Sequence, residues 1–280
     1  MTLLRKATES DFGDLITLYS SSVSCSRTQA AAEIRNLIGI DNFLVLEKEP
    51  VEADGPSIGA MLAAVPVTAG YRNGLWFTGM ATREDLRGKG IMTKLIDTCL
   101  RAYAQNGYFF ALVVPESPAA AQYYENLHFQ NAFQLRVVRK PIQPNLLAQA
   151  EFDTMTVRRF CETRKRYQPG CVTLPESSMT EIMTRLYTQG VTTVINQRGY
   201  GLYYVKGDVL QFIELQADND HAADLLLQAA REKTGATQAH VILAESQNLY
   251  MGEGKRCGYA MIRFLKKPFP LSNVYFRLLL

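Results

Sequence analysis

A basic, glycine-rich turn at residues 87–90, RGKG, stands between an apolar stretch and a long amphipathic one. After the turn, Ile91, Leu95, Cys99 and Tyr103 recur every four residues, which predicts a helix with one apolar face. The first N–H groups of a helix lack intrahelical partners and lie at the positive end of its dipole. Glycine residues let the main chain come close to a phosphate. The turn therefore predicts an anion site with two cationic side chains beside it.

The elements that must position this turn follow from apolar periodicity and turn residues. A first strand is expected near the N-terminus, and three successive antiparallel strands lead into the turn. A strand, a helix and a last strand are expected after the helix that follows the turn. The expected strands are 3–7, 42–47, 58–67, 75–81, 109–114 and 131–140, with a turn at Gly55-Pro56, and the expected helices start at residues 12, 29, 91 and 115.

The strand, turn and helix together resemble motif A of the GCN5-related N-acetyltransferase (GNAT) superfamily. That motif is Arg or Gln, two residues, Gly, one residue, and Gly or Ala, and it maps onto Arg87, Gly90 and Met92. Met92 departs from the pattern, because the family prefers a small residue there. A loop that carries Gly and Lys as turn residue and solvated charge is the alternative interpretation of this motif.

A second segment, ESPAAAQYYENLHF at 116–129, resembles the Asn-x-x-Ala-x-x-aromatic-Tyr-Glu-x-x-Gly-Phe segment of the same family. Ser117 stands at the Asn position, and Ala120, Tyr123, Tyr124 and Phe129 match. His128 replaces the glycine, so a non-glycine residue must adopt the backbone conformation of the helix end. Adjacent tyrosines on a helix are more often packing residues, which is the alternative for this pair.

The resemblance implies an α/β (α+β) fold with a mixed, mostly antiparallel central sheet flanked by helices. It also implies that acetyl-CoA is the cosubstrate and that an amine attacks the thioester directly. A phenol with a pKa near ~10 could protonate the departing thiolate, and the resemblance gives this catalytic role to Tyr124. The residues that it assigns to cofactor binding are Met80, Ala81, Thr82, Arg87, Gly88, Lys89, Gly90, Ile91, Met92 and Ser117.

The base that removes a proton from the amine stays unassigned, because the strand at 75–81 carries no carboxylate. Glu84 and Asp85 are expected closer to the phosphates than to the thioester. A chain of waters, Glu116 and the carboxylate of Leu280 are all open. The Leu280 carboxylate is included because the chain resembles, in outline, multidomain acetyltransferases of the enhanced intracellular survival type. In some of those proteins the C-terminus returns to the active site of the first domain. The alternative is that this apolar tail forms a core strand.

The second half of the chain repeats the order of the first. VVPES at 113–117 is echoed by ILAES at 242–246, and LRVVRKP at 135–141 by IRFLKKP at 262–268. We therefore expect the fold twice, with a catalytic domain at 1–140, a helical linker region at 141–190 and a degenerate copy at 191–280. In the second copy the turn reads QADNDH, without glycine, and its tyrosine position falls near Tyr250 or Met251, outside a helix. A structural or acceptor-shaping role is expected for it.

The linker region is expected to hold helices at 146–160 and 179–187. The run VRRFCETRKRY at 157–167 is basic, and we interpret it as a solvated helix face rather than a nucleic-acid patch.

Composition sets broad limits on function. The chain has 280 residues, a formal net charge of +3 and five scattered cysteines without paired metal-ligand spacing. No apolar run reaches ~18 residues, and the N-terminus turns polar early. We expect a cytoplasmic enzyme without metal, nucleic-acid or membrane partners, acting on a small-molecule or peptide amine, and a homo-oligomer is open.

Two competing functions remain at this stage. A non-catalytic acyl-CoA-binding sensor is favoured by Met92, His128 and the missing base. A nucleic-acid or interaction module that uses residues 157–167 would bind polyanions with a steep salt dependence.

Overall fold

The computed structural model describes residues 4–48 and 57–279, and the expected turn at Gly55-Pro56 and the terminal Leu280 lie outside the described residues. The chain forms two compact units, which are described separately. Unit 1 comprises Met1–Gln130, Thr173–Glu181 and Met261–Phe269; unit 2 comprises Asn131–Val172, Ile182–Ala260 and Pro270–Leu280.

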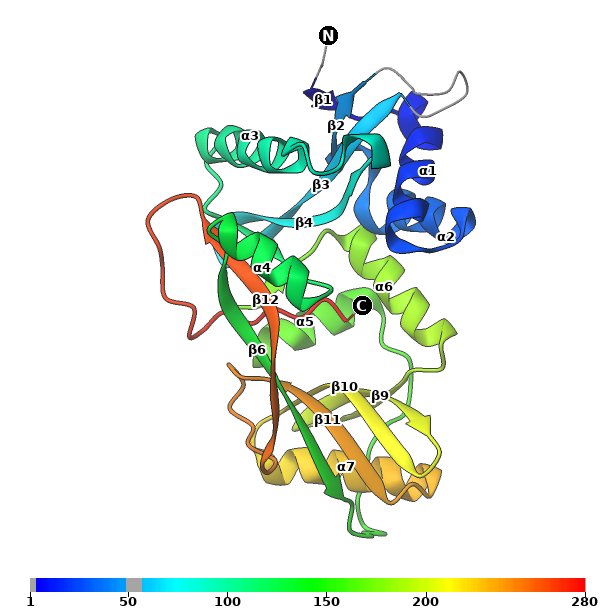
Figure 1. The fold of residues 1–280 in the computed structure, drawn as a ribbon. Helices are drawn as coiled ribbons and strands as arrows, with labels where there is room; N and C mark the ends of the chain where they lie inside the picture. Colours follow the sequence, from blue (N-terminus) through cyan, green and yellow to red (C-terminus); the bar gives the residue numbers. More distant parts are fainter. Residues whose placement is uncertain (1–3, 49–56, 280) are drawn as a thin grey trace. The chain divides into compact units, whose positions relative to one another are not determined.

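Unit 1 is built on a sheet with the strand order β1-β2-β3-β4-β5-β12 (Figure 1). Neighbouring strands run antiparallel except β4 and β5, which run parallel and are joined by α3. The strands are β1 (Leu4–Lys6), β2 (Phe43–Glu47), β3 (Ile58–Ala69), β4 (Arg72–Thr82), β5 (Phe110–Val113) and the end of β12 (Gly254–Phe264). The helices are η1 (Glu9–Asp11), α1 (Phe12–Val23), α2 (Arg27–Ala32), η2 (Glu33–Ile38), η3 (Ile40–Asn42), η4 (Glu84–Leu86), α3 (Ile91–Gln105), α4 (Pro118–Asn126) and the start of α6 (Glu176–Thr188).

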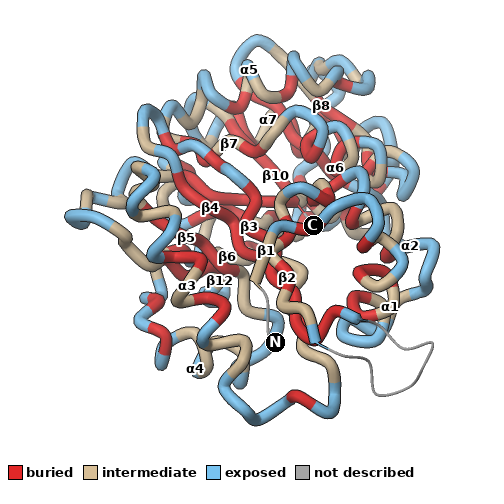
Figure 2. Tube along the Cα trace, turned by 90° about the horizontal axis from the view of Figure 1, so that it is seen from above, coloured by how far each residue is buried: buried red, intermediate tan, exposed pale blue. Residues whose placement is uncertain are grey.

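Both faces of this sheet are covered. In Figure 1, α3 lies on one side of β3 and β4, and α1 lies on the other. All residues of β3 from Ile58 to Val65 are buried, and Figure 2 shows the central strands as buried and the connecting loops as exposed. Leu95, Ile96, Cys99 and Leu100 of α3 pack on β3 and β4, as the four-residue spacing predicted.

Unit 2 repeats this plan with the strand order β6-β11-β10-β9-β8. Again one pair, β10 and β11, is parallel and joined by a helix, α7 (Asp220–Thr234), while the others are antiparallel. The strands are β6 (Gln130–Pro141), β8 (Thr192–Asn196), β9 (Gly199–Lys206), β10 (Val209–Ala217) and β11 (Gln238–Ala244). The short β7 (Val172–Thr173) and the helix α5 (Val157–Tyr167) precede them.

The expected α/β fold with a mostly antiparallel sheet is confirmed, but the unit boundaries differ from the ranges expected from the sequence. β6, the expected last strand of the first copy, pairs with β11 in unit 2. Residues Met261–Phe264, near the end of the second copy, pair with β5 in unit 1. The closing strand of each sheet is therefore supplied by the other half of the sequence.

Two local expectations were wrong, and the core-strand alternative for the tail is correct only in its burial. The helix expected at 146–160 begins only at Val157, and Leu146 and Leu147 lie in an irregular segment with 89% and 88% exposure. The basic run is not wholly solvated, because Arg164 is buried against Glu214 at 2.8 Å. The apolar tail is buried at residues 275–279, but only Tyr275 forms a strand-like bridge, to Cys171.

Asp11 provides a pH-dependent clamp at the start of unit 1. Its carboxylate accepts hydrogen bonds from Arg5 at 2.7 and 2.8 Å and from the Thr8 main chain at 2.8 Å. These bonds, Arg5 first, lower the pKa of Asp11 to about 2. Because the folded pKa lies below the unfolded one, the stabilisation is present above about pH 4 and is lost as the pH falls through 2.

We expect Asp11→Asn to lower the free energy of unfolding by roughly 2 kcal/mol at pH 7, and urea denaturation should show this difference shrinking below pH 4. A difference that is independent of pH would contradict the assignment.

Candidate functional site

The basic turn has the backbone that its glycines predicted. After η4, Arg87 is extended, Gly88 has φ +74°, and Gly90 caps α3 in the left-handed region with φ +70°. Most side chains disfavour this region, so the two glycines are needed for conformation rather than for space. All four residues from Arg87 to Gly90 are exposed. The start of α3 is therefore accessible to an anion.

The two cationic side chains of the turn donate hydrogen bonds to nearby main-chain oxygens. Arg87 Nε donates to the Thr82 oxygen at 3.1 Å, and Lys89 Nζ donates to the Asp85 oxygen at 2.7 Å. These bonds hold both charges beside the first N–H groups of α3. Ile91 and Met92, the first residues of the helix, are half-buried and pack against the core of unit 1. Met92 thus fills space at the turn, where the motif favours a small residue.

An open strand edge begins next to this turn. The parallel pairing of β4 with β5 ends at Trp76 and Leu112, while β4 continues to Thr82. Between Thr78 and Ala81 the register with β3 shifts, so that Gly79, with φ +56°, and Met80 form a bulge. Past the bulge, none of the described strands pairs with the edge of β4 that faced β5, so an extended ligand could pair with its main-chain groups as a strand would.

Tyr124 lies at the bulge. Its hydroxyl is 3.6 Å from Met80 Sδ, and its ring packs edge-on against Tyr123 and Phe129. Burial, followed by the charges of Tyr123 and Glu116, raises the pKa of Tyr124 well above its usual value. The phenol therefore keeps its proton at neutral pH and can donate a hydrogen bond. Met80 and Tyr124, far apart in sequence, are brought together.

The helix α4 fixes the direction of Tyr124. Ser117 caps the helix, its hydroxyl accepting from Ala120 N at 3.1 Å, and Pro118 occupies the first turn. This bond gives Ser117 a capping role, and its contact with a cofactor stays a prediction. At the other end, Phe129 N donates to the Tyr124 oxygen at 3.0 Å, which turns the chain back at His128.

His128 adopts the left-handed conformation that the family's glycine would adopt, with φ +61°. This confirms the strain predicted from the sequence. A non-glycine residue pays on the order of 1 kcal/mol there. We expect His128→Gly to leave the thermal midpoint unchanged or slightly raised, since the relief offsets the greater chain entropy of glycine. His128→Val should lower the midpoint by several degrees; thermal denaturation that ranks valine equal to glycine would contradict this.

Sequence reasoning missed the other wall of the site. Tyr19 of α1 is buried, and its hydroxyl donates to Glu33, the first residue of the π-helical segment η2. The Tyr19 ring lies beside Gly79, since a Cβ built there would be 3.3 Å from Tyr19 Cε2. The π-helical segment that begins at Glu33 is a form frequent at functional sites, and it is the feature that marks Tyr19 and Glu33 as candidates. Apolar periodicity in the sequence does not reveal a π-helix.

Glu116, one of the candidate bases, is exposed just before α4, and its charge raises the pKa of both Tyr19 and Tyr124. Glu84 and Asp85 lie in η4, beside the basic turn, as expected. Leu280 is outside the described residues, so its carboxylate stays untested.

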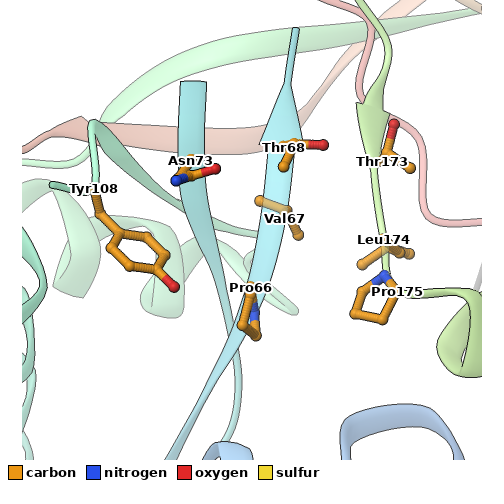
Figure 3. Close-up of a pocket in the computed structure, with 8 residues that line it drawn as sticks. All are labelled: Pro66, Val67, Thr68, Asn73, Tyr108, Thr173, Leu174 and Pro175. Carbon is orange, nitrogen blue, oxygen red and sulfur yellow. The ribbon is translucent and has the colours of Figure 1, made fainter. Parts of the chain in front are cut away.

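A separate pocket of unit 1 lies at the other end of β4. It has a volume of about 220 Å³ and is lined by Pro66, Val67, Thr68, Asn73, Tyr108, Thr173, Leu174 and Pro175 (Figure 3). Asn73 precedes Met80 by seven residues of strand, about 23 Å at ~3.3 Å per residue. This pocket does not belong to the Tyr124 site.

The corresponding opening in unit 2 is filled by the chain itself. The parallel pairing of β10 with β11 ends at Phe212 and Val241, and a bulge follows in β10. Beyond it, the Gln247 side chain donates to the Leu215 oxygen at 2.8 Å and accepts from Ala244 N at 2.6 Å, spanning the two strands. The opening between these strands is therefore closed by a carboxamide.

The start of α7 is likewise occupied. The Asp220 carboxylate accepts from the main-chain N–H groups of Tyr250 and Met251, and Asn219 caps the helix. Tyr250 is exposed and lies outside any helix, as expected. A phosphate at this turn would meet a carboxylate.

Among residues 4–48 and 57–279 no cluster of three or more His, Cys, Asp or Glu is arranged to hold a metal ion. No helix within the same described ranges is long and apolar enough to cross a membrane.

Comparison with known families agrees with this geometry. Residues 40–131, from β2 through α4, match the acetyltransferase (GNAT) domain. This part of unit 1 is therefore similar to a GNAT acetyltransferase domain. Members of this family use acyl-CoA, and acyl transfer is the general activity that the match supports. No curated protein sequence matches the chain.

Solved structures share the fold at low identity. A GCN5-related N-acetyltransferase from Kribbella flavida is 16% identical, with a TM-score of 0.68 over 95% of this chain and 72% of that one. One from Anabaena variabilis is 13% identical, with a TM-score of 0.70 over 95% and 73%. A tandem GNAT protein from the clavulanic acid biosynthesis pathway is 10% identical, with a TM-score of 0.53 over 96% and 99%.

Proposed function

We propose that the protein is an N-acetyltransferase that moves an acetyl group from acetyl-CoA to a primary amine. The observation that carries this proposal is the position of the Tyr124 hydroxyl, 3.6 Å from Met80 Sδ at the bulge of β4. The pyrophosphate would bind the turn from Arg87 to Met92, and the pantetheine arm would pair with β4 at Met80, Ala81 and Thr82.

In the proposed reaction the amine nitrogen attacks the thioester carbon directly. A main-chain N–H near the bulge would stabilise the oxyanion. As the carbon–sulfur bond breaks, Tyr124 gives its proton to the thiolate. The attacking nitrogen loses a proton to a base that stays unassigned, with Glu116 and Glu33 as the carboxylates whose charges act on the phenols of the site. Two such carboxylates support a cationic amine as acceptor.

The phosphate turn is tested by a pair of variants at Gly90 that differ mainly in charge. Asn tolerates the left-handed conformation, so we expect Gly90→Asn to bind acetyl-CoA within about tenfold of wild type. Gly90→Asp places a negative charge at the same point and should weaken binding by about a hundredfold or more. Isothermal titration checks both. Equal loss in the two variants would attribute the effect to backbone strain, and no loss in either would remove the turn from the site.

Turnover separates the enzyme from a non-catalytic acyl-CoA sensor. Thiol release should occur with acetyl-CoA and at least one member of a panel of amines. Binding without release across amino acids, polyamines, aminoglycosides and peptides would favour the sensor. For unit 2 we propose a structural or acceptor-shaping role, supported by the Gln247 and Asp220 contacts. A cytoplasmic location belongs to the same proposal, and the oligomeric state stays open.

A further inference from the structure

Unit 2 contains a buried cluster of charged and polar side chains. Glu214 accepts from Arg164 Nη2 at 2.8 Å, from the Tyr200 hydroxyl at 2.7 Å and from the Tyr275 hydroxyl at 3.2 Å. Arg164 Nη2 also donates to the main-chain oxygen of Arg277 at 2.9 Å, so the Arg164 side chain lies beside the Arg277 backbone. Arg164 is 5% exposed and Arg277 7%.

The cluster holds more positive than negative charge. Two guanidinium groups stand against the single carboxylate of Glu214. Burial is the main cause that raises the pKa of Tyr200, Tyr259 and Tyr275, so these phenols stay neutral. Counted over the described residues, the cluster therefore has a formal charge of about +1 in a place where an unbalanced charge is costly.

The buried polar atoms of this cluster that lack a hydrogen-bond partner are donors rather than acceptors. Among the described residues, the buried side-chain atoms without a partner are Arg164 Nε, Gln216 Nε2, Arg277 Nε and Arg277 Nη1, and all four are donors. The oxygens of the cluster are in use: both Glu214 oxygens accept bonds, and Gln216 Oε1 accepts from Gln168 at 3.0 Å.

These donors converge on one strand. Glu214 and Gln216 are two residues apart on β10, so their side chains share a face of the sheet. Arg277 Nη2 donates to the oxygen of Ile213 at 2.8 Å, which places this guanidinium beside the same stretch.

We propose that unit 2 has a buried binding site for a small monocarboxylate, formed by Arg277, Arg164 and Gln216. An ionised carboxylate only accepts hydrogen bonds and offers about four positions for them, which matches the unmet donors. Its single negative charge balances the cluster. Water suits the site less well, because its own hydrogens would need free acceptors. A phosphate dianion would leave the cluster with a negative charge.

The experiment is thermal denaturation of the full chain with sodium acetate or formate, against sodium chloride at equal ionic strength. Above its dissociation constant, each tenfold rise in carboxylate should raise the midpoint by about 3 °C. The response should persist in Gly90→Asp, which separates this site from the acyl-CoA turn. It should disappear in Arg277→Gln and persist in Arg159→Gln, an exposed arginine of α5.

A second variant keeps the proposal testable if Arg277→Gln does not fold. Gln216→Glu places a side-chain carboxylate inside the cluster. It should therefore raise the thermal midpoint without added acetate, and added acetate should no longer raise that midpoint further. The proposal is overturned if wild type responds to acetate no more than to chloride. It is also overturned if Gln216→Glu is less stable and still responds to acetate.

Discussion

Tyr124→Phe is expected to lower kcat for acetyl transfer by a hundredfold to ten-thousandfold, with little change in acetyl-CoA affinity. The loss is the size associated with removing a general acid. The ring contacts of Tyr124 with Tyr123 and Phe129 would remain, so binding and stability should change little. Steady-state thiol release gives kcat, and titration calorimetry gives the affinity.

Tyr123→Phe is the matched control for this prediction. Tyr123 is the adjacent residue on α4, and its hydroxyl lies 3.3 Å from Thr93 Oγ1 rather than at the bulge. Its loss should change kcat by less than tenfold. Equal effects of the two variants would mean that the tyrosine pair acts through packing, which is the alternative that the sequence left open.

Local signals predicted most of unit 1. The four-residue spacing after Gly90 predicted α3, because a helix buries one face at that period. Apolar runs bounded by turn residues predicted β3 and β4, which are buried over most of their central residues. The left-handed backbone of His128 was also predictable, since it stands where the motif has glycine. The turn and Tyr124 were found through motif spacing, and the structure brings Met80 to Tyr124.

What the sequence could not predict depends on distant partners. β6 has the pattern of a closing strand, but nothing in that pattern selects β11 over β5 as its neighbour. Arg164 lies in a basic run and looks solvated, and only Glu214, fifty residues away, makes it a buried residue. Tyr19 and Glu33 were interpreted as helix residues, because a hydrogen bond between two helices leaves no periodic signal.

The two units share a strand–helix–strand plan and differ at the end of its parallel strand pair. In unit 1 the edge of β4 beyond Trp76 is open and Tyr124 lies at its bulge. In unit 2 the equivalent edge is bridged by Gln247, and the bulge of β10 is followed by the buried Glu214. Both units have a bulge at this position, but in unit 2 a buried ion pair lies beside it, between Arg164 and Glu214.

Glu214→Ala is therefore expected to be among the most destabilising single changes in unit 2. It would leave the buried Arg164 without its counter-charge and would remove the acceptor of Tyr200 and Tyr275. Breaking a buried ion pair by removing one partner costs about 3 to 5 kcal/mol. Urea denaturation followed by far-UV circular dichroism measures the loss, while the fluorescence of Trp76, the single tryptophan, reports on unit 1.

The same helix offers a matched control, because α5 makes a second ion pair of nearly the same length. Arg158 Nε lies 2.9 Å from Glu162, and Arg164 Nη2 lies 2.8 Å from Glu214. The first pair is exposed, so water screens it and Glu162→Ala should cost less than about 1 kcal/mol. Burial, rather than distance, is then the variable that separates the two results. If both variants lose the same free energy of unfolding, the Arg164 cluster is hydrated in solution, and the carboxylate site inferred from its charge would lose its physical basis.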